Sequence, residues 1–253
     1  MRCEISGASK TWSHIAIDEV QDRCPLELYA LKYLMRPDTG LTLLGDLAQN
    51  TEPWIHEEWD AIWGNLELDE VESEKIKNIS LNYSFRVPAD ILEYAQVFRD
   101  LTGVEPANLE AVKDSSVNGL VQVELDSPFD FVALKDCITD ELEDLHPDAT
   151  VCIIAEGNVI PSLKAFVAAE FERSVRVLKL EESKGLEFDL VVVHNPVDFV
   201  QNDLYGENPK TLAYVARRLW IAYTRGTQKL IEANIRGNES IQDVLEEYEE
   251  YDE

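Results

Sequence analysis

Short apolar runs alternate with longer amphipathic segments along most of this sequence, and that alternation constrains the fold more than any other feature. The short runs are mostly apolar and rich in β-branched residues, which is typical of strands buried on both faces of a parallel sheet. The longer segments carry apolar residues at helical spacing. Together they predict an α/β fold in which a mainly parallel sheet carries helices on both faces.

The expected strands are the runs at 14–18, 41–45, 76–81, 120–125, 151–155, 175–180, 190–194 and 230–234. The expected helices are the segments at 25–35, 88–101, 129–145, 161–173 and 211–223. Pro25, Pro88 and Pro161 stand at or near the start of three of these segments, where a helix tolerates proline.

Two units are expected, because the acid-rich stretch at 67–77 resembles a connection. Residues 1–75 offer only two clear strands, fewer than a parallel sheet needs to cover both faces, so they read as the C-terminal part of a first domain. Residues 76–236 supply enough strands for one complete second domain. Residues 237–253 contain no Lys or Arg and are expected to form a solvated helix or an acidic tail.

The composition excludes some classes of protein. Twenty-two Lys and Arg against 50 Asp and Glu give a net charge of −28, so the chain as a whole repels phosphate backbones and is not a basic nucleic-acid clamp. The four Cys and four His form no metal-ligand motif. No stretch has the length of a membrane span, and the N-terminal residues lack the core of a signal peptide. We therefore expect a cytoplasmic protein without a membrane partner.

Two motifs of the first unit place polar side chains after strands. In HIAIDEVQD the strand ends in Asp18 and Glu19, where one carboxylate can hold Mg²⁺ and the other can orient a water molecule, as in a Walker B motif. In LTLLGDLAQNT the amide of Gln49 can hydrogen-bond a terminal phosphate. The alternative for both motifs is an ordinary turn with capping residues.

Three motifs of the second unit place charged groups beside a helix or a strand, and in one of them an aromatic ring precedes the charge. In LNYSFRVPADI, Phe85 can stack on a base and Arg86 can bind a phosphate. In LEESKGLEFDLVVV, Gly185 allows close backbone approach and Glu187 can bind a ribose hydroxyl. In LWIAYTRGTQKL, Arg225 at a helix end can reach a phosphate. A core aromatic, a plain turn and a helix-terminal arginine are the respective alternatives.

The order and spacing of DEVQD, GDLAQ, SFRVPADI, ESKGLEFD and AYTRGTQKL resemble motifs II to VI of superfamily 1 helicases of the UvrD/Rep type. The residues of the last three motifs are most similar to those of the HelD branch. That branch consists of helicase-like ATPases that bind bacterial RNA polymerase and help release it from nucleic acid. The resemblance implies RecA-like domains of the P-loop NTPase type. It also implies a motor that hydrolyses ATP with Mg²⁺ in a cleft between two such domains.

For the first unit, the resemblance implies that Asp18 helps to hold Mg²⁺, that Glu19 activates the attacking water and that Gln49 senses the γ-phosphate. Trp54 stands near the position of a base-stacking aromatic in related motors. With Trp59 and Trp63 nearby, packing between domains is the alternative for Trp54.

For the second unit, the resemblance implies that Phe85 stacks on adenine and that Arg86 binds phosphate. Glu187, two residues after Gly185, would contact the ribose, and Arg225 would be the arginine finger on the γ-phosphate.

Two departures limit the resemblance. No GxxxxGK[ST] loop occurs in the sequence, although the family places one before DEVQD, so we expect a C-terminal portion of a larger protein that is inactive alone. Glu181 stands where many relatives carry a strand-contacting His, and an acid there repels phosphate. Expected partners are DNA or RNA, bound through the missing N-terminal part, and RNA polymerase. A UvrD/Rep-type DNA helicase fragment and a non-catalytic acidic protein-interaction module remain alternatives.

Overall fold

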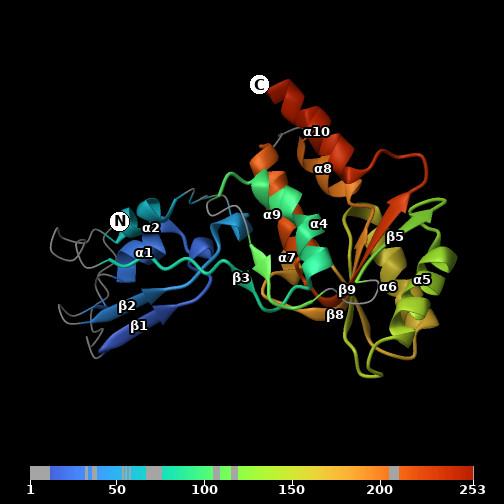
Figure 1. Cartoon of the computed structure of the whole chain (residues 1–253), viewed down its shortest axis with the longest axis horizontal. Coiled ribbons are helices and arrows are strands. Elements are labelled where there is room, and N and C mark those ends of the chain that lie inside the picture. Colours follow the sequence, from blue (N-terminus) through green and yellow to red (C-terminus); the bar gives the residue numbers. More distant parts are fainter. Residues whose placement is uncertain are drawn as a thin grey trace. The chain divides into compact units, whose positions relative to one another are not determined.

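A computed structural model of the chain describes residues 12–31, 34, 35, 39–52, 54, 56, 58–66, 76–104, 109–114, 119–204 and 211–252. The chain divides into two compact units, Met1–Ser80 and Leu81–Glu253 (Figure 1).

Unit 1 is built on a pair of parallel strands. Leu28 and Ile62, from the two helices that follow these strands, are fully buried. The strands expected at 14–18 and 41–45 are confirmed. The elements of unit 1 are β1 (His14–Ile17), η1 (Val20–Asp22), α1 (Pro25–Leu31), β2 (Gly40–Leu43), η2 (Leu47–Gln49) and α2 (Trp59–Asn65).

Unit 2 is built on a sheet of five strands in the order β5-β9-β8-β6-β7. Every pairing in this sheet is parallel. This sheet and the helices on its two faces confirm the predicted α/β class, with a parallel sheet as in RecA-like domains. The strands are β5 (Leu120–Leu125), β6 (Val151–Ile154), β7 (Val175–Leu178), β8 (Phe188–His194) and β9 (Gly226–Ile235).

Helices α5 (Phe131–Glu143) and α6 (Ile160–Glu170) cover one face of the sheet, and α4 (Ala89–Asp100) and α9 (Leu212–Tyr223) cover the other (Figure 1). The expected helices at these positions are therefore confirmed. Asp130 caps α5 by accepting a hydrogen bond from the backbone of Ala133, and such a cap contributes about 1 kcal/mol.

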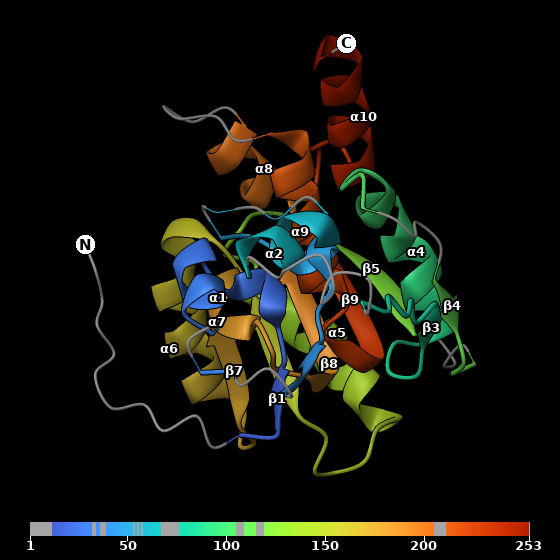
Figure 2. The same cartoon turned by 90° about the vertical axis from the view of Figure 1, so that its left-hand side faces the viewer.

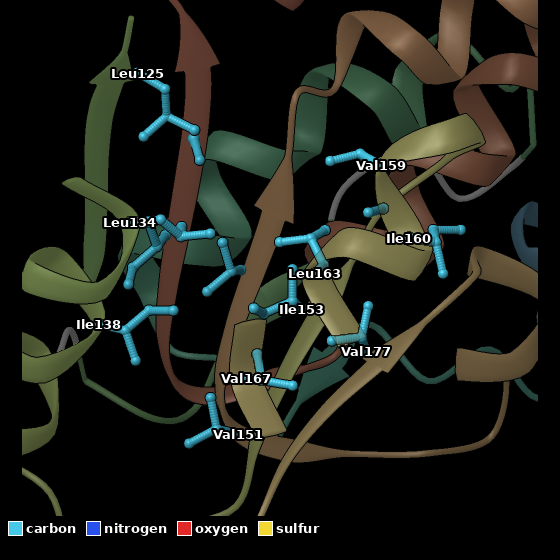
Figure 3. Packing of buried hydrophobic residues seen from close by; sticks show 14 of the residues in the cluster. Leu125, Leu134, Ile138, Val151, Ile153, Val159, Ile160, Leu163, Val167 and Val177 are labelled. Atoms are coloured by element: carbon cyan, nitrogen blue, oxygen red, sulfur yellow. The ribbon is translucent and has the colours of Figure 1, made fainter. Parts of the chain in front are cut away.

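The main hydrophobic core lies between the sheet and helices α5 and α6 (Figure 3). Ile138 from α5 and Leu163 from α6 are fully buried in this cluster, together with Ile153 from β6. Burial of each such side chain contributes about 1.5–3 kcal/mol. The core fixes the strand positions and therefore the loops that join strands at each edge of the sheet.

Smaller elements complete unit 2. Helix α10 contacts α9 (Figure 2), and its Ile241 and Leu245 are buried. No helix in the described part of the chain is long and apolar enough to cross a lipid bilayer. The remaining elements are β3 (Tyr83–Ser84), β4 (Glu110–Ala111), η3 (Gly157–Val159), α7 (Leu180–Ser183), α8 (Val197–Leu204) and α10 (Ile241–Asp252).

Two sequence-based expectations were wrong. The run at 76–81 forms no strand, and Ile79 and Leu81 are 82% and 79% exposed. Pairing begins only at β3, where β4 supplies a neighbouring strand, because an apolar run becomes a strand only beside a partner. The strand expected at 175–180 ends at Leu178, since Lys179 caps the short helix α7.

Candidate functional site

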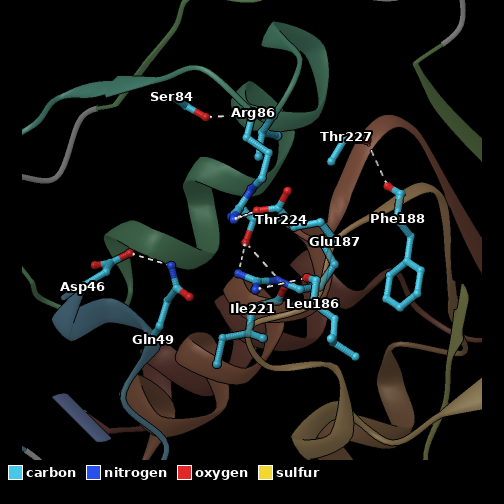
Figure 4. Close-up of polar contacts among 12 residues, drawn as sticks. Asp46, Gln49, Ser84, Arg86, Leu186, Glu187, Phe188, Ile221, Thr224 and Thr227 are labelled. Carbon is cyan, nitrogen blue, oxygen red and sulfur yellow. Dashed lines mark hydrogen bonds and ion pairs between the residues drawn. The ribbon is translucent and has the colours of Figure 1, made fainter. Parts of the chain in front are cut away.

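Arg86 and Glu187 form an ion pair at the surface of unit 2. Arg86 lies just before α4, and Glu187 lies directly before β8. Nη1 of Arg86 donates to Oε1 of Glu187 over 2.8 Å (Figure 4). The two side chains keep 34% and 53% of their exposure, so both charges are open to solvent. A pair this exposed contributes little to stability, and either partner can exchange the other for a ligand.

Phe85, the residue before Arg86, presents its ring to solvent. Its exposed fraction is 76%, so it is not part of the core. The segment around it is held from both sides, because the backbone of Val87 donates to Oγ of Ser84 and the backbone of Val112 donates to the carbonyl of Ser84. The loop thus displays an aromatic ring beside a guanidinium.

Arg225 lies between α9 and β9 and is 2% exposed. Its Nε donates to the carbonyl of Ile221 over 3.1 Å, and its Nη1 donates to the carbonyl of Leu186 over 3.5 Å. Arg225 therefore contacts the residue that precedes Glu187. In this conformation its guanidinium binds backbone carbonyls, and it must rotate outward to reach a ligand.

Adjacent parallel strands explain why these residues meet. Phe188 of β8 lies opposite Gly226 of β9, so Glu187 and Arg225, the residues before them, lie at neighbouring amino ends of the sheet. The backbone of Phe188 donates to the carbonyl of Arg225 over 3.1 Å. Arg225 follows the end of α9, as the sequence predicts, and Glu187 leads from the turn after α7 into β8.

Gly185 forms the turn between α7 and Glu187. Its φ is +70°, a left-handed conformation that favours glycine. Among the described residues no atom lies within 4 Å of the position that a Cβ would occupy, so within the protein the left-handed backbone alone favours glycine here. The turn directs the chain from α7 into β8 and so sets the position of Glu187.

We expect Gly185→Ala to lower the free energy of unfolding by about 1 kcal/mol, because only the left-handed backbone opposes the new methyl group. Urea denaturation of both proteins measures the difference. Gly185→Asn is the matched control, since asparagine tolerates this conformation better and should cost less. An alanine variant as stable as the wild type would contradict this role for Gly185.

Asp189 joins three strands beside the Arg86–Glu187 pair. Its carboxylate accepts hydrogen bonds from the backbone and the hydroxyl of Thr150 at 2.7 and 2.8 Å, and from Nε2 of Gln228 at 2.6 Å. Burial works in the opposite direction, but these hydrogen bonds prevail and lower the pKa of Asp189. Asp189 therefore fixes the amino ends of β6, β8 and β9 against one another.

This lowered pKa predicts a pH-dependent contribution to stability. The folded state favours ionised Asp189, so its contribution is complete above the unfolded pKa of about 3.9 and is lost as the pH falls through the lower folded pKa. We expect Asp189→Asn to be clearly less stable than the wild type at pH 7, and the difference to shrink near pH 3. Denaturant titrations at both pH values measure it, and an equal difference at both would refute the assignment.

In unit 1, Gln21 connects the first two motifs. Its Nε2 donates to Oε2 of Glu19 over 2.6 Å, and its Oε1 accepts from the backbone of Asp46 over 3.2 Å. A Cβ on Gly45 would lie 2.4 Å from that Oε1, so the close approach requires glycine. Sequence reasoning missed Gln21. The sequence does show a polar residue, Gln21, after the first strand and a glycine, Gly45, after the second. This combination could have predicted the contact.

Asp18 and Glu19 follow β1 directly, at the carboxyl end of the strand, as the sequence predicts. Glu19 has φ 52° and ψ 47°, a left-handed conformation that is uncommon outside glycine. The backbone of Glu19 donates to Oδ1 of Asp18 over 3.0 Å. Strain of this kind is frequent at functional positions, and here it turns the Glu19 side chain towards Gln21.

Gln49 lies at the end of η2 and donates from its Nε2 to Oδ2 of Asp46 over 3.0 Å (Figure 4). The other carboxylate oxygen of Asp46 accepts from the backbone of Ala48 over 3.1 Å. Asp46 therefore orients the amide of Gln49. Trp54 is partly buried, and its indole N–H has no hydrogen-bond partner among the residues that the structure describes. Its base-stacking role stays a prediction.

Glu181, the acid expected to repel a nucleic-acid strand, is partly neutralised. Nη1 of Arg218 lies 3.1 Å from its Oε1, and Nη2 of the same arginine lies 2.7 Å from Oε1 of Glu156. Arg218 on α9 therefore forms ion pairs with two acidic residues near the carboxyl end of the sheet.

The donor set limits how a metal could bind. Within the described ranges, no group of three or more His, Cys, Asp or Glu residues could hold an ion on its own. Mg²⁺ usually binds one or two carboxylates together with water and substrate phosphates. Asp18 and Glu19 are two neighbouring carboxylates of the kind that this mode uses.

No protein-family model and no curated protein match this sequence. Among solved structures, the C-terminal domain of a possible DNA helicase from Lactobacillus plantarum WCFS1 is similar, at 17% identity and a TM-score of 0.37. The match covers 60% of this chain and 88% of that chain.

Proposed function

We propose that this chain is the C-terminal motor portion of an ATP-dependent superfamily 1 helicase or translocase, HelD-like, that acts on nucleic acid or transcription complexes. One observation carries the proposal. Arg86, Glu187 and Arg225 belong to three motifs that are far apart in the sequence, and they converge at neighbouring loops of unit 2. The convergence of charged residues from three separate motifs supports a shared ligand.

The groups at this place suit a nucleotide. The exposed ring of Phe85 offers a stacking face. A phosphate can replace Glu187 as the partner of Arg86, which leaves the Glu187 carboxylate to accept hydrogen bonds from ribose hydroxyls. Bound Mg²⁺ would supply charge neutralisation for phosphoryl transfer. For unit 1, taken by itself, we propose that Asp18 helps to hold Mg²⁺, that Glu19 orients the attacking water and that Gln49 senses the terminal phosphate.

The net charge bears on the partner. A charge of −28 opposes direct capture of a phosphate backbone and favours docking on a basic protein surface. For that reason we propose a cytoplasmic transcription complex, such as one containing RNA polymerase, as the partner in preference to free DNA.

Titration of the chain with Mg·ADP, followed by ligand-observed NMR, tests the nucleotide site. We expect Arg86→Ala to weaken binding by about tenfold or more, because a charge-assisted hydrogen bond contributes about 1.5–3 kcal/mol. Arg236→Ala is the matched control, since Arg236 is also an exposed, ion-paired arginine of unit 2 but lies at the other end of β9, beside Glu124 and Asp126. Equal losses in both variants, or no saturable binding, would contradict the proposal.

The burial of Arg225 favours a second candidate, a non-catalytic acidic module that docks on a basic partner. An arginine held by the carbonyls of Ile221 and Leu186 has a structural role that needs no phosphate. The two candidates differ in their response to nucleotide, because the module would bind a basic partner without binding Mg·ADP.

A further inference from the structure

Glu232 is a carboxylate with no exposed surface in the middle of strand β9. Its Oε2 accepts hydrogen bonds from the hydroxyls of Tyr223 and Tyr94 at 2.5 and 2.8 Å. Its Oε1 accepts from the amides of Asn234 and Gln122 at 2.7 and 3.1 Å. Every contact places a donor against a carboxylate oxygen, which is the arrangement that an ionised carboxylate requires.

The two tyrosines belong to different helices on the same face of the sheet, α4 and α9. Their rings stack with centroids 5.9 Å apart, and Phe98 of α4 lies 4.7 Å from the Tyr223 ring. Burial and the neighbouring Glu232 carboxylate raise the pKa of both hydroxyls, so both remain donors throughout the practical pH range. One acid thus ties α4 and α9 to the same strand.

Those two helices carry the two arginines of the candidate site. Helix α4 begins three residues after Arg86, and Tyr223 is the last residue of α9, two residues before Arg225. Strand β9 begins directly after Arg225. Anchors therefore lie on both sides of Arg225, at Tyr223 and on β9, while Tyr94 anchors the helix that Arg86 leads into.

The stability of the fold alone does not explain why the buried residue at position 232 is a glutamate. Burying a carboxylate is costly, and apolar side chains of similar volume often serve stability as well or better. We infer that Glu232 is a positioning residue, which fixes α4 and α9 on β9 and thereby sets where Arg86 and Arg225 stand. The inference rests on the proposed function of the two arginines, although its structural part can be tested without a ligand.

Hydrogen–deuterium exchange on the full chain tests the positioning. The reporters are hydrogen-bonded amides at the two helix ends, Ala89 bonded to Lys113, and Thr224 bonded to Trp220. We expect Glu232→Gln to speed exchange in the segments 84–92 and 222–228 by at least about tenfold, the factor that a loss of about 1.4 kcal/mol in local opening produces.

Lys229→Met is the matched control. Lys229 is also a buried charge on β9, but it pairs with Glu141 at 2.5 Å and Asp144 at 3.1 Å at the end of α5, on the opposite face. This control should leave exchange in both reporter segments unchanged. Equal acceleration in both variants, or acceleration spread over the whole of unit 2, would show a general structural role and overturn the inference.

Single donors can be removed if Glu232→Gln does not fold. Tyr94→Phe should loosen mainly the segment 84–92, and Tyr223→Phe mainly the segment 222–228, because each variant keeps its ring and loses one hydroxyl. Wild-type exchange at these segments in both variants would overturn the inference.

Affinity for Mg·ADP supplies the functional readout. We expect Glu232→Gln to weaken it at least fivefold and Lys229→Met to leave it unchanged. If the wild type does not bind Mg·ADP, the proposed nucleotide site fails, whereas the exchange data still decide whether Glu232 positions the arginines. If the wild type binds and Glu232→Gln binds equally well, the positioning role fails alone.

Discussion

These 253 residues are expected to show no steady-state hydrolysis of ATP with Mg²⁺ and to bind the triphosphate weakly. The sequence has no GxxxxGK[ST] loop, whose backbone N–H groups and lysine make several charge-assisted hydrogen bonds to phosphate. Each such bond contributes about 1.5–3 kcal/mol, so the loss of two weakens binding by about two orders of magnitude or more.

A coupled ATPase assay on the chain, and on a longer protein in which such a loop precedes DEVQD, measures this effect. Hydrolysis should appear only in the longer protein, and Glu19→Gln should abolish most of it there. Robust turnover by the 253 residues alone would mean that another segment binds the triphosphate.

Truncation of Arg225 should have the largest effect on stability among the site residues. The side chain is 2% exposed, and its guanidinium satisfies the carbonyls of Ile221 and Leu186. Arg225→Ala leaves a cavity and removes these donors, so we expect the free energy of unfolding to fall by about 2–4 kcal/mol.

Denaturant unfolding of Arg225→Ala, Arg225→Lys and the wild type measures this loss. The lysine variant keeps the stem and the charge and should recover part of the stability, whereas its single ammonium cannot reproduce the fork of contacts. Arg236→Ala is the exposed control and should change stability by no more than about 1 kcal/mol. An unchanged stability of Arg225→Ala would contradict the burial of this side chain.

The regular part of unit 2 could be predicted from the sequence because its strands and helices carry continuous apolar patterns. Strand β5 has the predicted bounds, and β6 ends one residue earlier than predicted. Helix α7 could not be predicted, since four residues are too few to show helical periodicity. The prediction of a strand at 76–81 was wrong because a strand depends on a neighbouring strand as much as on its own residues.

The polar contacts also include features that the sequence indicates and features that only the fold shows. The motifs mark Arg86, Glu187 and Arg225 as candidates, but the bond between Arg86 and Glu187 spans 101 residues and follows only from the fold. Glu232 was visible in the sequence as an acid inside an apolar strand, which is costly without partners. Its two tyrosine donors lie 138 and 9 residues away, so their convergence required the structure.

The strand order of unit 2 constrains how this protein can fold during its synthesis on the ribosome. Strand β5 pairs only with β9 within the described sheet, and Gln122 meets Glu232 across 110 residues. While β6, β7 and β8 emerge, β5 has no neighbour and β8 keeps one bare edge, and such edges invite aggregation. A nascent chain paused between β8 and β9 should therefore be held by chaperones, and release should follow once β9 closes the gap between β5 and β8.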